Sequence, residues 1–147
     1  MILQAFTDGA SRGNPGESGI GIIVKDDKND VVFSLNGYIG TTTNNVAEYT
    51  ALLTLLRRIG GIACTGLVVH SDSELVVRQV NGRYKVRDHE LKKYHGQVIA
   101  AISSLPFDVE LKHIPREMNR DADTLANLGI DTKAALMLQD PEENKPH

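Results

Sequence analysis

Cysteine is almost absent from this chain of 147 residues, and long apolar runs are missing altogether. The single cysteine, Cys64, excludes an internal disulfide and fits a reducing compartment. Because the chain has no set of His and Cys ligands, we do not expect a structural zinc site. No apolar run approaches a membrane span and the N-terminus has no signal-peptide pattern, so we expect a cytoplasmic protein without membrane association.

An excess of basic charge is missing as well. The net charge is −3, which is not typical of a nucleic-acid-binding protein. The charges are unevenly distributed, however, because residues 78–93 hold six basic and only two acidic side chains. This segment forms either a local basic face or a set of ordinary solvated charges beside a helix, and the charge pattern alone favours the second.

Repeats and interdomain linkers are also absent, and the length fits one α/β domain. We expect this domain to span residues 1–130, followed by a tail of residues 131–147 that is partly disordered or docked on the domain. The apolar patterns predict strands at residues 3–7, 19–25, 31–39, 67–71 and 108–113, and helices at residues 43–59, 73–81, 90–104 and 121–129. A turn is expected at residues 9–16 and a loop at 115–119.

Two acidic residues follow predicted strands. Asp8 comes directly after the first strand and Asp72 after the fourth. The connection between these strands crosses over a helix, so the strands can pair in parallel and bring their carboxyl ends to one edge of the sheet. Ligands of open α/β sheets collect at that edge, and we therefore expect the two carboxylates to be neighbours in a site.

A third acid, Glu48, lies on the apolar stripe of the helix predicted at residues 43–59. A bare carboxylate in such a place needs a partner, because burial of the ion costs roughly several kcal/mol. A metal ion is one such partner. A capping or ion-paired glutamate is an equally good interpretation of the helix alone.

A fourth acid comes from the last predicted helix, where Asp121 and Asp123 share the first turn. The helix dipole favours acids there whatever their function, so the pattern of the helix does not choose between them. Four carboxylates would suit Mg²⁺, which prefers oxygen ligands and can act in pairs in phosphodiester hydrolysis. No Ser or Cys stands in an activating context, so covalent catalysis is less attractive.

Four motifs together resemble type 1 ribonuclease H, over about residues 3–129. They are Thr-Asp-Gly-Ala-Ser with Asn-Pro-Gly after it, Thr-Thr-Asn-Asn-x-x-Glu, Ser-Asp-Ser, and Asn-x-x-Ala-Asp-x-Leu-Ala. The resemblance implies a five-stranded mixed sheet of order 3-2-1-4-5 flanked by helices. It also implies a metal-dependent endoribonuclease that cuts the RNA strand of RNA–DNA hybrids and leaves 5′-phosphate and 3′-hydroxyl ends.

The same resemblance implies roles for individual residues. It makes Asp8, Glu48, Asp72 and Asp123 the ligands of two Mg²⁺ or Mn²⁺ ions, with Asp8 bridging, and leaves Asp121 as a capping acid. The substrate contacts that it implies come from seven residues: Gly9, Ala10, Ser11, Asn14, Thr43, Asn44 and Asn45. Thr43 would lie in a pocket for a phosphate of the DNA strand, which suits a helix N-terminus. Helix capping is the alternative interpretation of Asn44 and Asn45.

The chain departs from better-known members of that family in two places. The long basic handle is reduced to residues 83–89, so we expect weaker hybrid affinity and a strong salt dependence. In the loop before the last helix, Arg116 stands where a histidine is often found, while His113 falls at the end of the preceding strand. Arginine cannot shuttle protons at neutral pH, but it could contact the scissile phosphate or help release the product.

The sequence is compatible with three functions. A hybrid-cleaving enzyme, acting as a monomer, is favoured by the complete set of four acids. A weakly active or inactive nucleic-acid-binding module of the same fold is the alternative, motivated by the short handle and the missing histidine. A nuclease acting on DNA is disfavoured by the Thr-Thr-Asn-Asn and Asn-x-x-Ala-Asp patterns.

Overall fold

A computed structural model describes residues 1–133, and the expected tail from residue 134 onward lies outside them. The elements follow the predicted order: β1 (Ile2–Gly13), β2 (Gly16–Lys25), β3 (Val31–Thr42), α1 (Asn44–Ile59), β4 (Gly66–Ser71), α2 (Glu74–Val80), α3 (His89–Ser104), β5 (Asp108–His113), the 3₁₀ turn η1 (Arg116–Met118) and α4 (Arg120–Thr132). None of the helices within residues 1–133 is long and apolar enough to cross a membrane.

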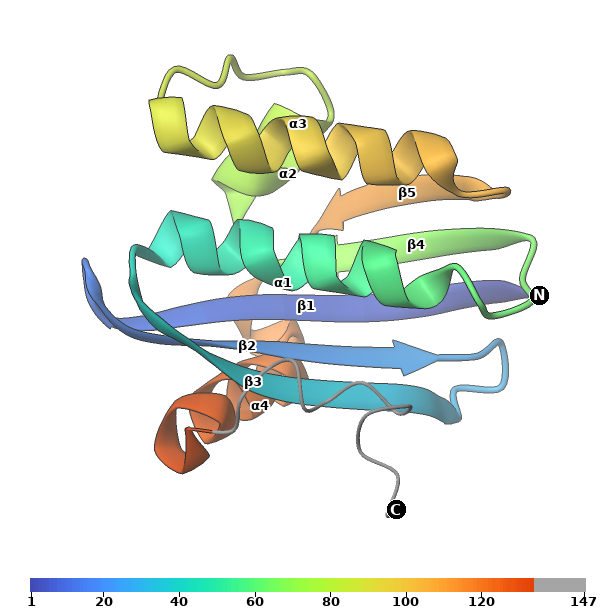
Figure 1. Cartoon of the computed structure of the whole chain (residues 1–147). Helices are drawn as coiled ribbons and strands as arrows, with labels where there is room; N and C mark the ends of the chain where they lie inside the picture. Colours follow the sequence, from blue (N-terminus) through green and yellow to red (C-terminus); the bar gives the residue numbers. More distant parts are fainter. Residues whose placement is uncertain (134–147) are drawn as a thin grey trace, which may run out of the picture.

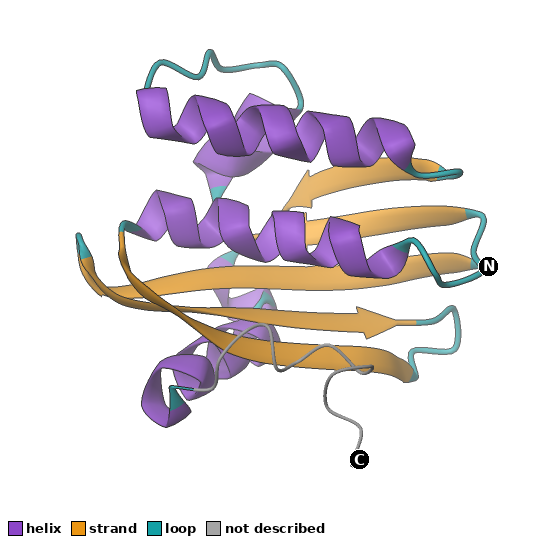
Figure 2. Cartoon of the chain, in the orientation of Figure 1, coloured by secondary structure: helices purple, strands orange, loops and turns teal. Residues whose placement is uncertain are grey.

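The five strands form one mixed sheet in the order β3-β2-β1-β4-β5, as expected. β1, β2 and β3 form an antiparallel meander, whereas β4 pairs in parallel with both β1 and β5. Helices α1 and α3 lie over one face of the sheet and α4 covers the opposite face (Figures 1 and 2). The architecture predicted from the motifs is therefore confirmed.

One local prediction was wrong. The segment at residues 9–16, expected to be a turn, is mostly strand: β1 and β2 pair without interruption as far as Gly13 and Gly16. Only Asn14 and Pro15 form the turn at the tip of this long hairpin. Glycine, serine and asparagine disfavour strands only weakly, and pairing with β2 and β3 overrides that preference here.

The core lies between the sheet and α1. Alternate residues of β1 and β2 point to this face, and Leu3, Ala5, Ile20 and Ile22 are completely buried there. α1 begins where the Thr43 hydroxyl accepts a hydrogen bond from the backbone N–H of Val46 at 3.3 Å, as an N-cap does. The helix then buries an apolar stripe against the sheet, and this packing fixes its first turn above the middle of β1.

The packing of α4 on the opposite face of the sheet depends on glycines in β2. A Cβ atom at Gly21 would lie 2.1 Å from the Ala122 carbonyl oxygen, and one at Gly19 would lie 2.4 Å from that of Ala126. The backbone of α4 therefore rests directly on the backbone of β2, which no larger residue would permit. This contact fixes the position of α4 relative to β1 as well, because Gly21 pairs with Asp8.

Candidate active site

Asp8 and Asp72 meet where the parallel pairing of β1 and β4 ends. Asp72 follows β4 as expected, whereas Asp8 lies inside β1, which continues to Gly13, and does not follow the strand. The last parallel pair of these strands joins Thr7 to Ser71, and the two acids follow at the next position of each chain. Together with Glu48 they offer three carboxylate oxygens that lie within 4.8 Å of one another. The expectation that parallel pairing makes Asp8 and Asp72 neighbours is confirmed, and Glu48 lies beside them.

Glu48 reaches this edge because α1 approaches β1 very closely at Gly9. A Cβ atom at Gly9 would lie 2.2 Å from the Ala47 carbonyl carbon and 2.3 Å from the Glu48 nitrogen. The Gly9 N–H donates a hydrogen bond of 2.6 Å to Oε1 of Glu48, whose side chain is only 6% exposed. Glu48 is therefore not a helix cap; a backbone donor holds it against the other acids.

Asp123 is brought to Asp8 through the glycine contact between the two layers. Asp8 pairs with Gly21, Gly21 touches Ala122, and Asp123 is the next residue of α4. The carboxyl groups of Asp123 and Asp8 interact, and this interaction helps to raise the pKa of Asp8. By contrast, Asp121 is exposed and lines a hollow with Phe6 and Lys25.

The electrostatics of this cluster favour a cation. Burial is the largest cause that raises the pKa of Asp8 above its ordinary value, and the nearby carboxylates of Glu48, Asp72 and Asp123 raise it further. Burial also raises the pKa of Glu48, while the Gly9 N–H and the charge of Arg116 lower it in part. Acids crowded in this way cannot all ionise without compensating positive charge. Carboxylate oxygens are the ligands that hard divalent cations prefer, so the cluster fits such an ion.

The sequence analysis gave no role to Asn119, although it belongs to one of the motifs. Its side chain is almost completely buried, and its Nδ2 donates hydrogen bonds to the Thr7 carbonyl at 2.9 Å and to Oδ2 of Asp72 at 3.1 Å. Asn119 stands at the N-cap position of α4 but makes no side-chain capping bond. Its amide instead links the middle of β1 to Asp72 after β4, next to the acids. An asparagine at a helix start reads as a cap, which explains why sequence reasoning missed it.

The residues expected to contact substrate gather at the N-terminus of α1 and the tip of the β1–β2 hairpin. Oδ1 of Asn14 accepts a hydrogen bond of 3.1 Å from the Asn44 N–H, so the tip is joined to the helix start. Asn14, Thr43 and Asn45 line a groove whose other wall is residues 88–91 at the start of α3. The capping side chain is Thr43, so the alternative interpretation of Asn44 and Asn45 as caps was wrong.

The remaining expected contacts lie on β1. Gly9 is buried beneath α1, and Ala10 pairs with Gly19 on the neighbouring strand. The Ser11 hydroxyl donates a hydrogen bond of 2.9 Å to the Thr42 carbonyl, which links β1 to the end of β3. These three residues thus continue from Asp8 toward the hairpin tip.

The loop before α4 presents Arg116 beside the acids. Arg116 begins η1 and is exposed, and its charge acts on the carboxyl group of Glu48. His113 is the last residue of β5, where it pairs with Ser71. The structure therefore brings Arg116, from the loop position expected for it, within electrostatic reach of the cluster.

Comparisons with known proteins agree with this geometry. A family model described as reverse transcriptase-like matches residues 6–129. A ribonuclease H of Halorhodospira halophila is 30% identical over 148 residues, which cover 91% of this chain and 96% of the relative. The crystal structure of LC11-RNase H1 in complex with an RNA/DNA hybrid has a TM-score of 0.84 and 39% identity, and the match covers 88% of this chain and 97% of that one. This chain belongs to the type 1 ribonuclease H family.

Among other ribonucleases H, the RNase H1 of Halobacterium salinarum superposes with a TM-score of 0.85 at 32% identity, covering 90% of this chain and 99% of that chain. A bifunctional protein of Mycobacterium tuberculosis is 38% identical over 146 residues, 99% of this chain. The chain spans only 39% of that relative's length. The part that matches this chain is the N-terminal RNase H domain of that protein.

Proposed function

We propose that this protein is a metal-dependent endoribonuclease that hydrolyses the RNA strand of RNA–DNA hybrids and leaves 5′-phosphate and 3′-hydroxyl ends. The observation that carries the proposal is the convergence of Asp8, Glu48 and Asp72 within 4.8 Å, with Asp123 beside Asp8. The hybrid bound to the 39% identical LC11-RNase H1 supports the choice of substrate.

The four acids are proposed to hold two divalent ions, Mg²⁺ or Mn²⁺. Asp8 suits the bridging position, because it interacts with the carboxyl groups of Glu48, Asp72 and Asp123. Bound ions of this kind supply an activated water and stabilise the leaving 3′ oxygen in phosphodiester hydrolysis. The protein's own part is to keep the carboxylates together, through the Gly9 N–H on Glu48 and the Asn119 amide on Asp72.

Substrate contacts are proposed for the hairpin tip and the start of α1. The groove beside Asn14, Thr43 and Asn45 would receive the hybrid, with N–H and hydroxyl groups of the helix N-terminus facing a phosphate. Gly9, Ala10 and Ser11 would lie along the RNA strand. Arg116 is proposed to contact the scissile phosphate or to aid product release, and its permanent charge excludes a role as proton shuttle. We also propose that the protein acts as a monomer, because a single chain supplies all four acids.

A binding module with little or no turnover is the second candidate. The short loop between α2 and α3 motivates it, because few basic residues remain there to hold a hybrid. The presence of all four acids argues against it, because three of them lie together and Asp123 interacts with Asp8.

One comparison of substrates tests these proposals. Labelled RNA–DNA hybrid, duplex DNA and duplex RNA are incubated with the protein in Mg²⁺, in Mn²⁺ and in EDTA, at low and high salt. We expect cleavage of the hybrid RNA strand only with a divalent ion, and a steep fall of hybrid affinity with salt. Hybrid binding without metal-dependent cleavage would support the binding module instead, and cleavage of duplex DNA would overturn the choice of substrate.

A further inference from the structure

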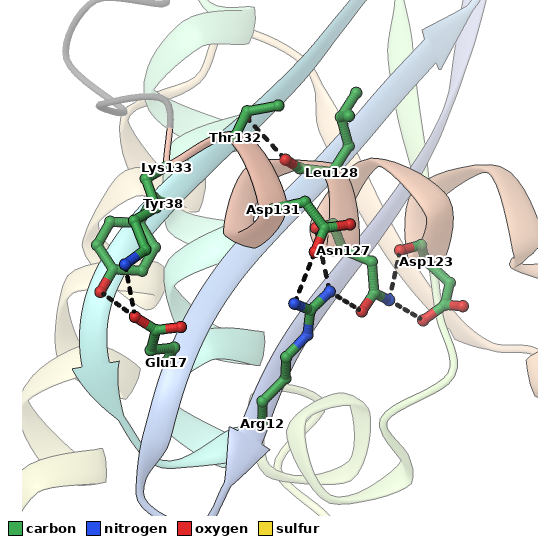
Figure 3. Close-up of polar contacts among 9 residues, drawn as sticks. All are labelled: Arg12, Glu17, Tyr38, Asp123, Asn127, Leu128, Asp131, Thr132 and Lys133. Carbon is green, nitrogen blue, oxygen red and sulfur yellow. Dashed lines mark hydrogen bonds and ion pairs between the residues drawn. The ribbon is translucent and has the colours of Figure 1, made fainter.

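A polar network links Arg12, near the C-terminal end of β1, to Asp123, the acid that α4 carries (Figure 3). Nδ2 of Asn127 donates hydrogen bonds to the Asp123 carbonyl oxygen at 3.1 Å and to its Oδ1 at 3.4 Å. Nη2 of Arg12 donates to Oδ1 of Asn127 at 3.2 Å, and Nη1 of Arg12 pairs with Asp131 at 2.6 Å. The amide of Asn127 thus lies between the arginine and the acid.

The spacing of these residues shows that β1 and α4 meet at two points. Asp8 and Arg12 are four residues apart on β1 and point to the same face, a separation of about 13 Å along a strand. Asp123 and Asp131 are eight residues apart on α4, a separation of about 12 Å along a helix. Asp8 therefore meets Asp123 at one point, while Arg12 meets Asp131 at the other, with Asn127 halfway.

The backbone of α4 does not depend on this network. The close contacts of Gly19 and Gly21 with α4, and of Gly129 with Gly37, already determine where the helix lies. The Arg12–Asp131 pair is also largely solvated, with side chains 45% and 57% exposed, and such pairs add little to stability. The Asn127 amide therefore acts on the orientation of the Asp123 side chain, whose carboxylate is repelled by that of Asp8.

We propose that Asn127 is a positioning residue for Asp123, and that Arg12 holds Asn127 in the orientation that allows this. The inference rests on the proposed function, since it assigns Asp123 to the metal site. It adds a link between the hairpin that carries Asn14 and the acid on the opposite layer. Partners of this kind, one step removed from a metal ion, change metal affinity by about 10- to 100-fold when they are removed.

The test compares Asn127→Ala and Arg12→Gln with a matched control, Lys133→Gln. Lys133 forms the neighbouring ion pair of the same helix end, 3.0 Å from Glu17, but has no contact with Asn127 or Asp123 among the contacts of the described residues. Two quantities are measured for each protein: the rise of Tm on adding Mn²⁺ to the metal-free protein, and the Mg²⁺ concentration that gives half-maximal hybrid cleavage.

Asn127→Ala is expected to need about tenfold more Mg²⁺, and to show a smaller Mn²⁺-dependent rise of Tm. At saturating Mg²⁺ its KM for hybrid should equal that of the wild type. Arg12→Gln should shift both quantities less, in the same direction, and the double variant should be no worse than Asn127→Ala alone, because both residues act through one contact. Lys133→Gln should match the wild type in both.

An unchanged Mg²⁺ midpoint in Asn127→Ala would overturn the inference, and so would an equal shift in Lys133→Gln. A wild-type protein that cuts no hybrid would remove the proposed function but not this test, because the Mn²⁺-dependent rise of Tm still compares the variants. If Asn127→Ala then gains as much Tm from Mn²⁺ as the wild type does, Asn127 does not position Asp123.

Discussion

The replacement Gly9→Ala tests whether close contact between α1 and β1 creates the site. The added Cβ atom would lie 2.2 Å from the Ala47 carbonyl carbon, whereas ordinary contacts begin at 3.4 Å, so the helix start must move by about 1.2 Å. The atoms that the added Cβ would meet belong to the backbone of Ala47 and Glu48, so no side chain can turn away to relieve the clash. Overpacking of this kind costs about 1–3 kcal/mol of folding free energy.

The replacement should lower activity as well as stability. The movement separates Glu48 from the Gly9 N–H, its hydrogen-bond donor at 2.6 Å, and from the carboxylates of Asp8 and Asp72. A displacement of about 1 Å in an active site lowers the rate by about 100-fold. The assay is hybrid cleavage at saturating Mg²⁺, together with denaturant unfolding of the same preparation.

Gly96→Ala is the matched control. A Cβ atom at Gly96 meets nothing within 4 Å, and the residue lies inside α3. Alanine is a better helix former than glycine, so this variant should be more stable than the wild type by about 0.5–1 kcal/mol, with unchanged activity. A Gly9→Ala protein as stable and as active as the Gly96→Ala protein would refute the argument that this contact builds the site.

Three further predictions follow from the buried polar groups. Asn119→Ala removes the donor to Thr7 and Asp72 and should lower the free energy of unfolding by about 1–3 kcal/mol. An unchanged denaturation midpoint would show that these hydrogen bonds do not stabilise the fold. Burial and the neighbouring acids raise the pKa of Asp8, so the folded state keeps a proton that the unfolded state releases above about pH 4, and stability falls as pH rises. In EDTA, Asp8→Asn should therefore melt several degrees above the wild type at pH 7.5, a difference that should vanish near pH 4; equal Tm values at both pH values would contradict this. Burial lowers the pKa of His70, so its contribution to stability should be lost as pH falls below about 6.5. The Tm of the wild type relative to that of His70→Gln should therefore fall between pH 8 and pH 5.5, and a constant difference would contradict this.

The positions of Asp8 and Asp72 could be predicted because strand order and parallel pairing decide them. Glu48 could be placed on the buried stripe of its helix, but the sequence left a cap, an ion pair and a metal ligand equally possible. The structure places Glu48 beside Asp8 and Asp72 through Gly9, whose missing side chain lets the first turn of α1 rest on β1.

The choice of Asp123 over Asp121 could not be made from the physics of one helix, since both lie in its first turn. A signal was nevertheless present in β2, where Gly19 and Gly21 alternate within an apolar strand. Glycines at this spacing mark a face that another backbone approaches, and here that backbone is α4. The continuation of β1 to Gly13 was not predicted, because its residues are of the types that form turns. Pairing with the neighbouring strand β2 holds them in the sheet.

The acids gathered around Asp8 are proposed to be required for hydrolysis of the hybrid. The most direct measurement is a time course with a hybrid labelled on its RNA strand, in Mg²⁺, for the wild type and for Asp8→Asn at equal concentration. We expect the wild type to release RNA fragments with 5′-phosphate ends, and the folded Asp8→Asn protein to release none. Cleavage by Asp8→Asn at the wild-type rate would contradict it.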